Sequence, residues 1–305
     1  MGNRVIPDHA LVINTDTARL AVTLHGGCIL AYRLEDGTGG FDILRPPAGS
    51  GDRPPAPMDT ASFPLVPYSN RISAGRFRFG GQDHRLPLNF GDSPNSIHGV
   101  GWQSRWNLRR QAADEIVLDL RHDGDGWPFP FHASQRFTLD GAALHHELAV
   151  TNVSGRPMPA GLGLHPYFPR HRGARLTADV THVWLTDEQC LPTERVSCPD
   201  QWNLRQDADV DALKCDNQFE PWRGPARIVW PADGVGVELD ASDDLDRLVV
   251  FAPDGADFFC VEPVSHMTDA FNHDLRGLSR EEAGMRVLED GETWRVWMRL
   301  TPAVL

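Results

Sequence analysis

Lysine is almost absent from this 305-residue chain, since Lys214 is the only one and arginine supplies the other basic side chains. Schiff-base chemistry and phosphate-binding P-loops both depend on lysine, so these two enzyme classes have almost no candidate residue. The chain has 29 basic and 42 acidic residues, for a formal net charge of −13. Such a surface repels phosphate backbones and anionic lipid, and nucleic acid is not an expected partner.

Cysteine is scarce, and long apolar runs are missing. The five cysteines are an odd number without a C-x-x-C pair, which indicates free buried thiols rather than a disulfide framework or a zinc ribbon. No stretch approaches the roughly 18 apolar residues of a membrane span. Residues 1–20 also lack the apolar core of a secretory signal, so we expect a cytoplasmic protein with no membrane partner.

Helical signals are few. The best is Ser279 with Glu282 three residues later, a capping-box pattern that predicts one short helix within residues 279–288. No rhythm of alternating strands and helices is present. Turn residues are abundant instead, with 28 glycines and 24 prolines.

Alternating apolar positions run through the chain, as in LHHELAV at 144–150, and they predict many short strands. Glycine turns at 80–81 and 140–141 predict antiparallel hairpins. About twenty strand candidates exceed the roughly eight of a small closed barrel. We therefore predict an all-β fold, a large antiparallel β-sandwich, as a single domain over residues 1–305. The Pro-rich stretches 45–57 and 221–231 are expected as long surface loops.

Polar side chains interrupt apolar surroundings in several segments. His165 follows AGLGL and should stand at the rim of a buried strand, either as a structural histidine or as a catalyst. Glu262 follows FFCV, where partial desolvation would raise its pKa and make it a proton acceptor. Asn70 and Arg71 could hydrogen-bond two neighbouring hydroxyl groups of a ligand, although Arg71 equally suits a structural ion pair. His98, next to glycine, suits either catalysis or loop packing.

Four motifs in this chain resemble those of one family. They are NRI-x-x-G-x-F (70–77), IHG followed by tryptophan (97–106), LHPYF (164–168) and VEP with a downstream asparagine (261–272). In this order and spacing the chain resembles aldose 1-epimerases, also called galactose mutarotases, over about residues 20 to 300.

The resemblance implies a β-sandwich of the galactose mutarotase type, which interconverts the α and β anomers of a free aldose without cofactor or metal. On this reading Glu262 is the general base at the C1 hydroxyl, His165 is the general acid at the ring oxygen, and His98 assists at the same ring region. The residues that would hold sugar hydroxyls are Asn70, Arg71 and Asp216. The implied partner is a small sugar, and the chain would be a monomer or a homodimer.

Two segments depart from the common family pattern. HGVGW at 98–102 lacks a second glycine directly after HG, and PVSHMTDAFN at 263–272 is typical of a bacterial subgroup. Galactose specificity is therefore not implied, and the preferred aldose and any phosphate or acid group on it stay open. We interpret His266, Asp269 and Asn272 as residues that shape a loop rather than line a cleft.

The chemistry of anomer exchange calls for these residue types in its own right. Opening a pyranose breaks the C1–O5 bond, which requires a proton removed at O1 and another delivered at O5. One carboxylate and one imidazole are a minimal set for these transfers. Reclosure on the other carbonyl face uses the same pair with the roles reversed.

Three alternatives use the same residues. A glycoside hydrolase would pair the carboxylates of Asp216 and Glu262 about 5 to 9.5 Å apart. A carbohydrate-binding protein would keep an aromatic cleft with an inert acid–base pair. An iron site could use two histidines and one carboxylate, His98, His165 and Glu262, but their spacing is no local metal signature, and no metal is expected.

Overall fold

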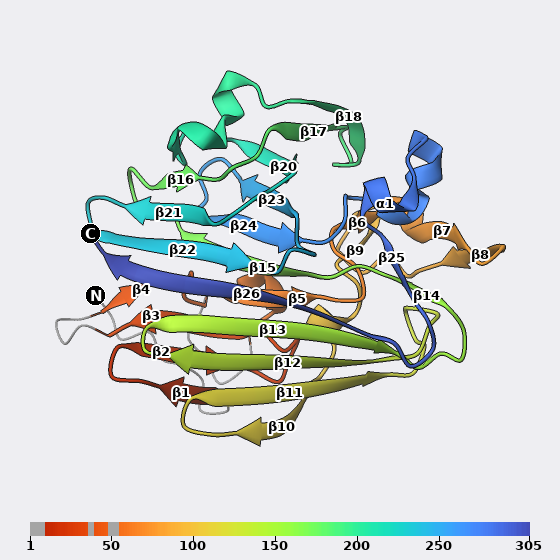
Figure 1. Cartoon of the computed structure of the whole chain (residues 1–305), viewed down its shortest axis with the longest axis horizontal. Coiled ribbons are helices and arrows are strands. Elements are labelled where there is room, and N and C mark those ends of the chain that lie inside the picture. The colour runs from red at the N-terminus through yellow and green to blue at the C-terminus, as the bar shows by residue number, and fades with distance from the viewer. Residues whose placement is uncertain (1–9, 36–39, 48–54) are drawn as a thin grey trace.

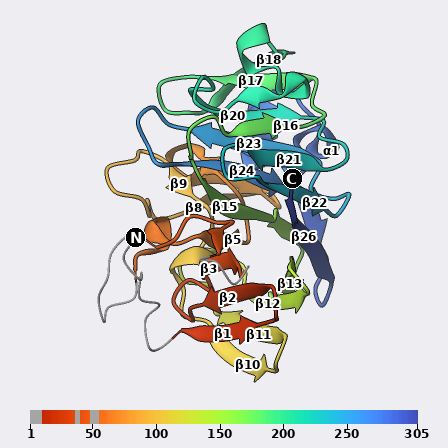
Figure 2. The same cartoon turned by 90° about the vertical axis from the view of Figure 1, so that its left-hand side faces the viewer.

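Two large antiparallel sheets, stacked face to face, form the body of the protein (Figures 1 and 2). The computed structural model describes residues 10–35, 40–47 and 55–305. Every named strand pair in these residues is antiparallel. The predicted all-β sandwich is therefore confirmed.

Counted over the described residues, the first sheet has eleven strands. Its order is β1 (Leu11–Asn14), β2 (Ala18–Val22), β3 (Ile29–Leu34), β5 (Ser62–Leu65), β15 (Gly163–Pro169), β24 (Phe258–Val264), β23 (Arg247–Ala252), β20 (Cys215–Glu220), β17 (His182–Thr186) and β18 (Pro192–Ser197), with β4 (Phe41–Asp42) paired to β3. The second sheet has nine strands. Its order is β10 (Asn107–Gln111), β11 (Glu115–His122), β12 (Phe131–Asp140), β13 (Ala143–Asn152), β26 (Thr293–Val304), β22 (Val235–Ala241), β21 (Ala226–Trp230), β16 (Arg175–Thr177) and β19 (Ala208–Asp209).

Short elements gather at one end of the sandwich, at the right of Figure 1. They include the strand pairs β6 (Arg71–Ile72) with β9 (Ser96–Ile97), β7 (Arg76–Phe79) with β8 (Gln82–Arg85), and β14 (Met158–Ala160) with β25 (Arg286–Leu288), and the helix α1 (Arg280–Ala283). The 3₁₀ helices are η1 (Pro57–Asp59), η2 (Ser73–Gly75), η3 (Gly101–Gln103), η4 (Asp200–Trp202), η5 (Leu204–Gln206) and η6 (Ala270–Arg276). No helix within the described residues is long and apolar enough to cross a membrane.

The predicted turns and cap are present, with one correction. Gly80 and Gly81 join β7 to β8 with positive φ angles of 59° and 77°, which glycine adopts without strain. The Ser279 capping box forms with both of its hydrogen bonds. The helix ends at Ala283, however, because Gly284 takes a left-handed conformation, and Arg286–Leu288 form a strand.

The prediction of a long surface loop over residues 221–231 is wrong. Ala226–Trp230 form β21, which pairs with β22 and alternates buried and less buried side chains. The flanking prolines mark the ends of this short strand, since proline cannot donate a ladder hydrogen bond. The other expected loop, 45–57, includes residues 48–54, which lie outside the described residues. Residues 1–9, where no secretory signal is expected, lie outside them as well.

All five cysteines are free, and Cys190 and Cys198 are only half-buried.

Side-chain alternation gives the eleven-stranded sheet two different faces. On β15, Leu164 and Phe168 belong to the large apolar core, whereas Tyr167 belongs to a smaller apolar cluster. On β24, Val261 belongs to the large core and Cys260 to the smaller cluster. Because side chains alternate along a strand, His165 and Glu262 lie on the face of the smaller cluster.

A buried histidine within the nine-stranded sheet is expected to make the free energy of unfolding depend on pH. His146 on β13 stacks on Phe137 at 4.2 Å and bonds the Gln135 side-chain oxygen at 2.9 Å. Burial lowers the pKa of His146 to about 3. The unfolded chain, with an ordinary pKa of about 6.5, binds this proton first, so the stability contributed by neutral His146 is lost as pH falls from about 6.5 towards 3.

We expect His146→Gln, which keeps a donor for Gln135, to flatten this dependence. Between pH 7.5 and 5 the native protein should lose about 2 kcal/mol more free energy of unfolding than the variant. Urea unfolding of both proteins at the two pH values measures the difference. Equal losses in both proteins would show that His146 is not the titrating group.

Candidate active site

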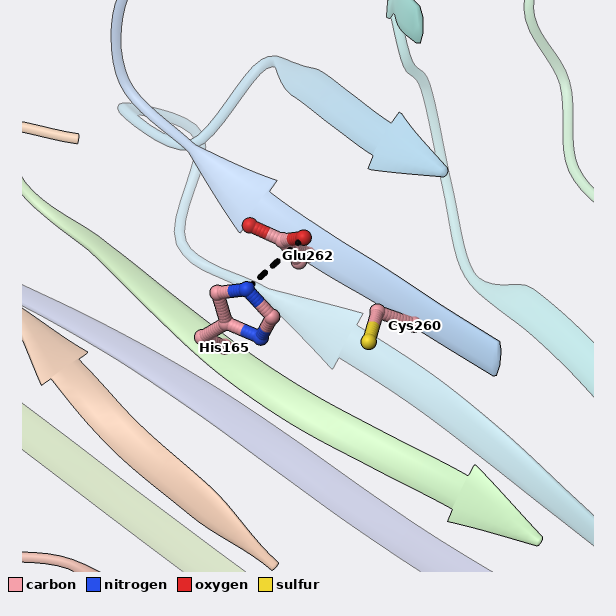
Figure 3. A group of neighbouring side chains, drawn as sticks. All are labelled: His165, Cys260 and Glu262. Carbon is pink, nitrogen blue, oxygen red and sulfur yellow. Dashed lines mark ion pairs between the residues drawn. The ribbon is translucent and has the colours of Figure 1, made fainter. Parts of the chain in front are cut away.

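His165 and Glu262 face each other across two neighbouring strands (Figure 3). The register of β15 with β24 pairs Gly163 with Val264 and Tyr167 with Cys260, which places His165 opposite Glu262. Their side chains meet, with His165 Nε2 lying 3.2 Å from Glu262 Oε1. Two residues 97 positions apart in the sequence thus form one acid–base pair.

The carboxyl group of Glu262 is enclosed, with 2% of the side chain exposed. Burial raises the pKa of Glu262 well above its usual value, and the nearby charge of Asp216 acts in the same direction. The Arg71 guanidinium acts in the opposite direction. The second carboxyl oxygen, Oε2, has no hydrogen-bond partner among the described residues.

The ring of His165 is held by stacking. It lies between Phe63, with ring centroids 4.4 Å apart, and Tyr167, at 4.6 Å. Burial lowers the pKa of His165 to about 3, and the charge of Arg45 lowers it further. Nδ1 has no hydrogen-bond partner among the described residues. Packing between these two rings holds the imidazole in place, with Nε2 towards Glu262.

The two pKa shifts favour the uncharged form of each partner in the pair. Low polarity disfavours both a carboxylate at Glu262 and an imidazolium at His165. Both shifts move the pair towards a carboxylic acid beside a neutral imidazole, and a proton can pass between Oε1 and Nε2 across their 3.2 Å contact. The same pair can become a carboxylate and an imidazolium without gaining or losing a proton.

His98 borders this pair as a neutral hydrogen-bond donor. Its ring lies 5.2 Å from the His165 ring, edge to face. Its Nδ1 accepts the Asn70 backbone N–H at 3.1 Å, so the proton of the neutral ring is on Nε2. Burial and the neighbouring His165 hold the pKa of His98 well below its usual value.

The residue after His98 must be glycine. Gly99 has a φ of +69°, and a Cβ there would lie 2.3 Å from the Val66 carbonyl oxygen.

Asn70, Arg71 and Asp216 form a second polar group beside the pair. Asn70 Oδ1 accepts hydrogen bonds from the Arg71 backbone N–H and from Arg71 Nη1, each at 3.0 Å. Arg71 Nη2 lies 3.4 Å from Asp216 Oδ2. These residues line a small polar cleft, together with Trp184 and Gln218. Arg71 and Asp216 are close enough to Glu262 to act on its pKa.

The structure thus brings all six predicted site residues into one region, where Asn70 links the cleft to His98. It uses His266, Asp269 and Asn272 differently. His266 Nε2 accepts the Ser69 backbone N–H at 2.9 Å. Asp269 Oδ1 accepts the Asn272 amide at 2.7 Å. Asp269 Oδ1 also accepts the Ser73 backbone N–H, and the Asn272 amide donates to the Arg76 carbonyl oxygen, so these side chains join their loop to the segment 69–76.

Sequence reasoning missed several residues around the site. Tyr167 and Phe63 pack the His165 ring, and Trp184 and Gln218 line the cleft. Gln218 had a usable signal, because on β20 it lies two positions after Asp216 and shares its face. Trp184 had none, since only the pairing of β17 with β20 brings it to the cleft.

One group of possible metal ligands occurs among the described residues. Donor atoms of His165, Cys260 and Glu262 all lie within 4.8 Å of one another (Figure 3). This group contains Cys260 in place of the His98 of the iron-site alternative. Burial, and secondly the Glu262 charge, raise the pKa of the Cys260 thiol well above its usual value.

A family model and several known proteins match this chain. A family model described as aldose 1-epimerase matches residues 9–301. The uncharacterized protein YphB of Escherichia coli K12 is 32% identical over 259 residues, which are 82% of this chain and 86% of YphB.

A crystal structure of an Escherichia coli K12 protein, provisionally assigned as an aldose 1-epimerase, superposes with a TM-score of 0.86. It is 30% identical, with 97% of this chain and 99% of that chain covered. Galactose mutarotase of Mus musculus is 28% identical over 136 residues, which are 41% of this chain and 39% of the mouse protein.

Proposed function

The chain belongs to the aldose 1-epimerase family, and we propose that it interconverts the α and β anomers of a free aldose by acid–base ring opening and reclosure. The observation that carries the proposal is the 3.2 Å contact between His165 Nε2 and Glu262 Oε1 beside a polar cleft. In this proposal, residues 1–305 act as one domain, and the reaction needs no cofactor.

Ring opening uses the charged form of the pair. Hydroxyl groups of a bound sugar that donate to the free Oε2 of Glu262 favour its carboxylate, and the mobile proton then lies on His165. Glu262 takes the proton from O1, and the C1–O1 bond becomes a carbonyl. The electron pair of the C1–O5 bond goes to O5, which receives the proton from His165.

Ring opening returns the pair to its favoured neutral state. Glu262 ends as a carboxylic acid and His165 as a neutral imidazole, the forms that burial stabilises. The buried environment therefore favours both proton transfers of the opening step. After rotation about C1–C2, reclosure runs the transfers in reverse and forms the other anomer.

The remaining residues bind and orient the sugar in this proposal. His98 donates from Nε2 near the ring oxygen and stays uncharged. Asn70, Arg71 and Asp216 hold sugar hydroxyls at the cleft. Because Arg71 is paired with Asp216, the two charges balance, which suits an uncharged sugar.

Polarimetry tests the proposed function. Freshly dissolved α-glucose or α-galactose should reach its equilibrium rotation faster with the protein present, and the final rotation should stay the same because a catalyst does not change the equilibrium. Exchange NMR on a panel of free aldoses identifies the preferred one. If no aldose equilibrates faster while oligosaccharides release reducing ends, the protein is a glycoside hydrolase and the proposal fails.

A further inference from the structure

Cys260 belongs to the active site by position but has no part in the proposed reaction. It lies two residues before Glu262 on β24, and Figure 3 shows both side chains on the side of the strand that faces His165. The thiol is fully buried. Its sulfur, a ring nitrogen of His165 and a carboxyl oxygen of Glu262 lie within 4.8 Å of one another.

Two buried polar atoms of the group lack a partner. His165 Nδ1 and Glu262 Oε2 are buried and have no hydrogen-bond partner among the described residues. A buried polar atom without a partner costs free energy, and a ligand that engages these side chains would recover part of it.

The donor set identifies the class of ligand. One sulfur, one imidazole nitrogen and one carboxylate oxygen are the ligands of Zn²⁺, and three protein ligands leave a fourth position open, as in catalytic zinc sites. Magnesium and calcium prefer oxygen ligands throughout. A thiolate and a carboxylate also balance the two charges of the cation, so the buried group would carry no net charge.

We propose that Zn²⁺, or another borderline-soft divalent cation, binds His165, Cys260 and Glu262 and reversibly inhibits anomer exchange. The cation replaces the thiol proton of Cys260 and the carboxyl proton of Glu262, which pass to solvent, and no atom changes its oxidation state. It occupies the two groups that transfer protons to and from the sugar. The inhibition rests on the proposed function, whereas the binding does not.

Cobalt(II) tests the binding without reference to activity. Titration of the full-length protein with Co²⁺ should produce a near-ultraviolet thiolate-to-cobalt absorption band that saturates at one ion per chain. Cys260→Ala should lose this band. Cys28→Ala is the matched control, because Cys28 is a buried thiol of the same apolar cluster outside the ligand group, and it should keep the band. A band that survives in Cys260→Ala would overturn the proposal.

Polarimetry tests the inhibition. Zn²⁺ should slow mutarotation, a chelator should restore the rate, and Mg²⁺ at the same concentration should have no effect. With each protein compared with its own metal-free rate, Cys260→Ala should need at least about 10-fold more Zn²⁺ than the native protein for half-inhibition, because losing a ligand exceeds the 10- to 100-fold loss typical of second-shell changes. Equal sensitivity of Cys260→Ala and the native protein would overturn the proposal.

The two measurements separate this inference from the proposed function. A cobalt band that depends on Cys260, in a protein without mutarotase activity, would support the site and refute the function. Mutarotation that is insensitive to Zn²⁺, in a protein without a cobalt band, would support the function and refute the site. Thermal unfolding of both cysteine variants confirms that each is folded before either test.

Discussion

Replacing Glu262 by glutamine should slow mutarotation at least about 100-fold. Glutamine keeps the size and the hydrogen-bonding oxygen of the side chain, but it cannot accept the O1 proton. Glu262 is the carboxyl group that contacts His165, at 3.2 Å. No second carboxylate contacts His165 among the described residues, so no neighbour can replace it. Polarimetry at several sugar concentrations gives kcat and KM for the variant.

Asp216, which lies in the cleft, provides the matched control for Glu262→Gln. Asp216→Asn also removes one carboxylate, but this group pairs with Arg71 and is proposed to hold a sugar hydroxyl. We expect it to raise KM more than it lowers kcat, since it takes no part in proton transfer. If Glu262→Gln retains most of its kcat, or if Asp216→Asn loses as much kcat as Glu262→Gln, Glu262 is not the base.

The fold could be predicted because its signals are local. Alternating apolar residues predict strands wherever one face is buried, and glycine pairs such as 80–81 predict hairpins. The wrong prediction of a loop at 221–231 also comes from relying on local signals. At 226–230 a five-residue strand between prolines has too little alternation to outweigh the turn signals, and it forms because β16 and β22 lie on both sides of it.

The identities of the site residues could be predicted, but their contacts could not. The motifs single out His165 and Glu262, yet whether the two side chains meet depends on the register of β15 with β24. That register is fixed by pairs such as Tyr167 with Cys260, 93 residues apart. A shift of one residue would turn one side chain to the opposite face of the sheet.

Of the two pKa shifts in the pair, the sequence predicted the one at Glu262 but not the one at His165. The apolar run before Glu262 predicts desolvation and a raised pKa, and the structure bears this out. The low pKa of His165 has no such local signal, because its ring is enclosed by Phe63 from another strand and by Tyr167. The sequence likewise predicts only an ordinary buried thiol at Cys260, because its distances from His165 and Glu262 depend on the fold.

Replacing His165 by asparagine should also slow mutarotation at least about 100-fold, because asparagine cannot deliver the proton to O5. His98 cannot replace it as the acid, since its Nδ1 is occupied by the Asn70 backbone N–H and burial keeps its ring neutral. The variant also leaves an apolar gap between Phe63 and Tyr167, so its folding is checked by thermal unfolding.

The double variant of Glu262→Gln and His165→Asn distinguishes a coupled pair from two independent groups. One proton moves within the pair, so removing either partner stops both transfers, and the second substitution should cost little more than the first. Polarimetric kcat values for the native protein, both single variants and the double variant form the cycle. If the two single effects multiply to about 10,000-fold or more, the groups act separately, and the shared proton that the buried contact provides is not the basis of catalysis.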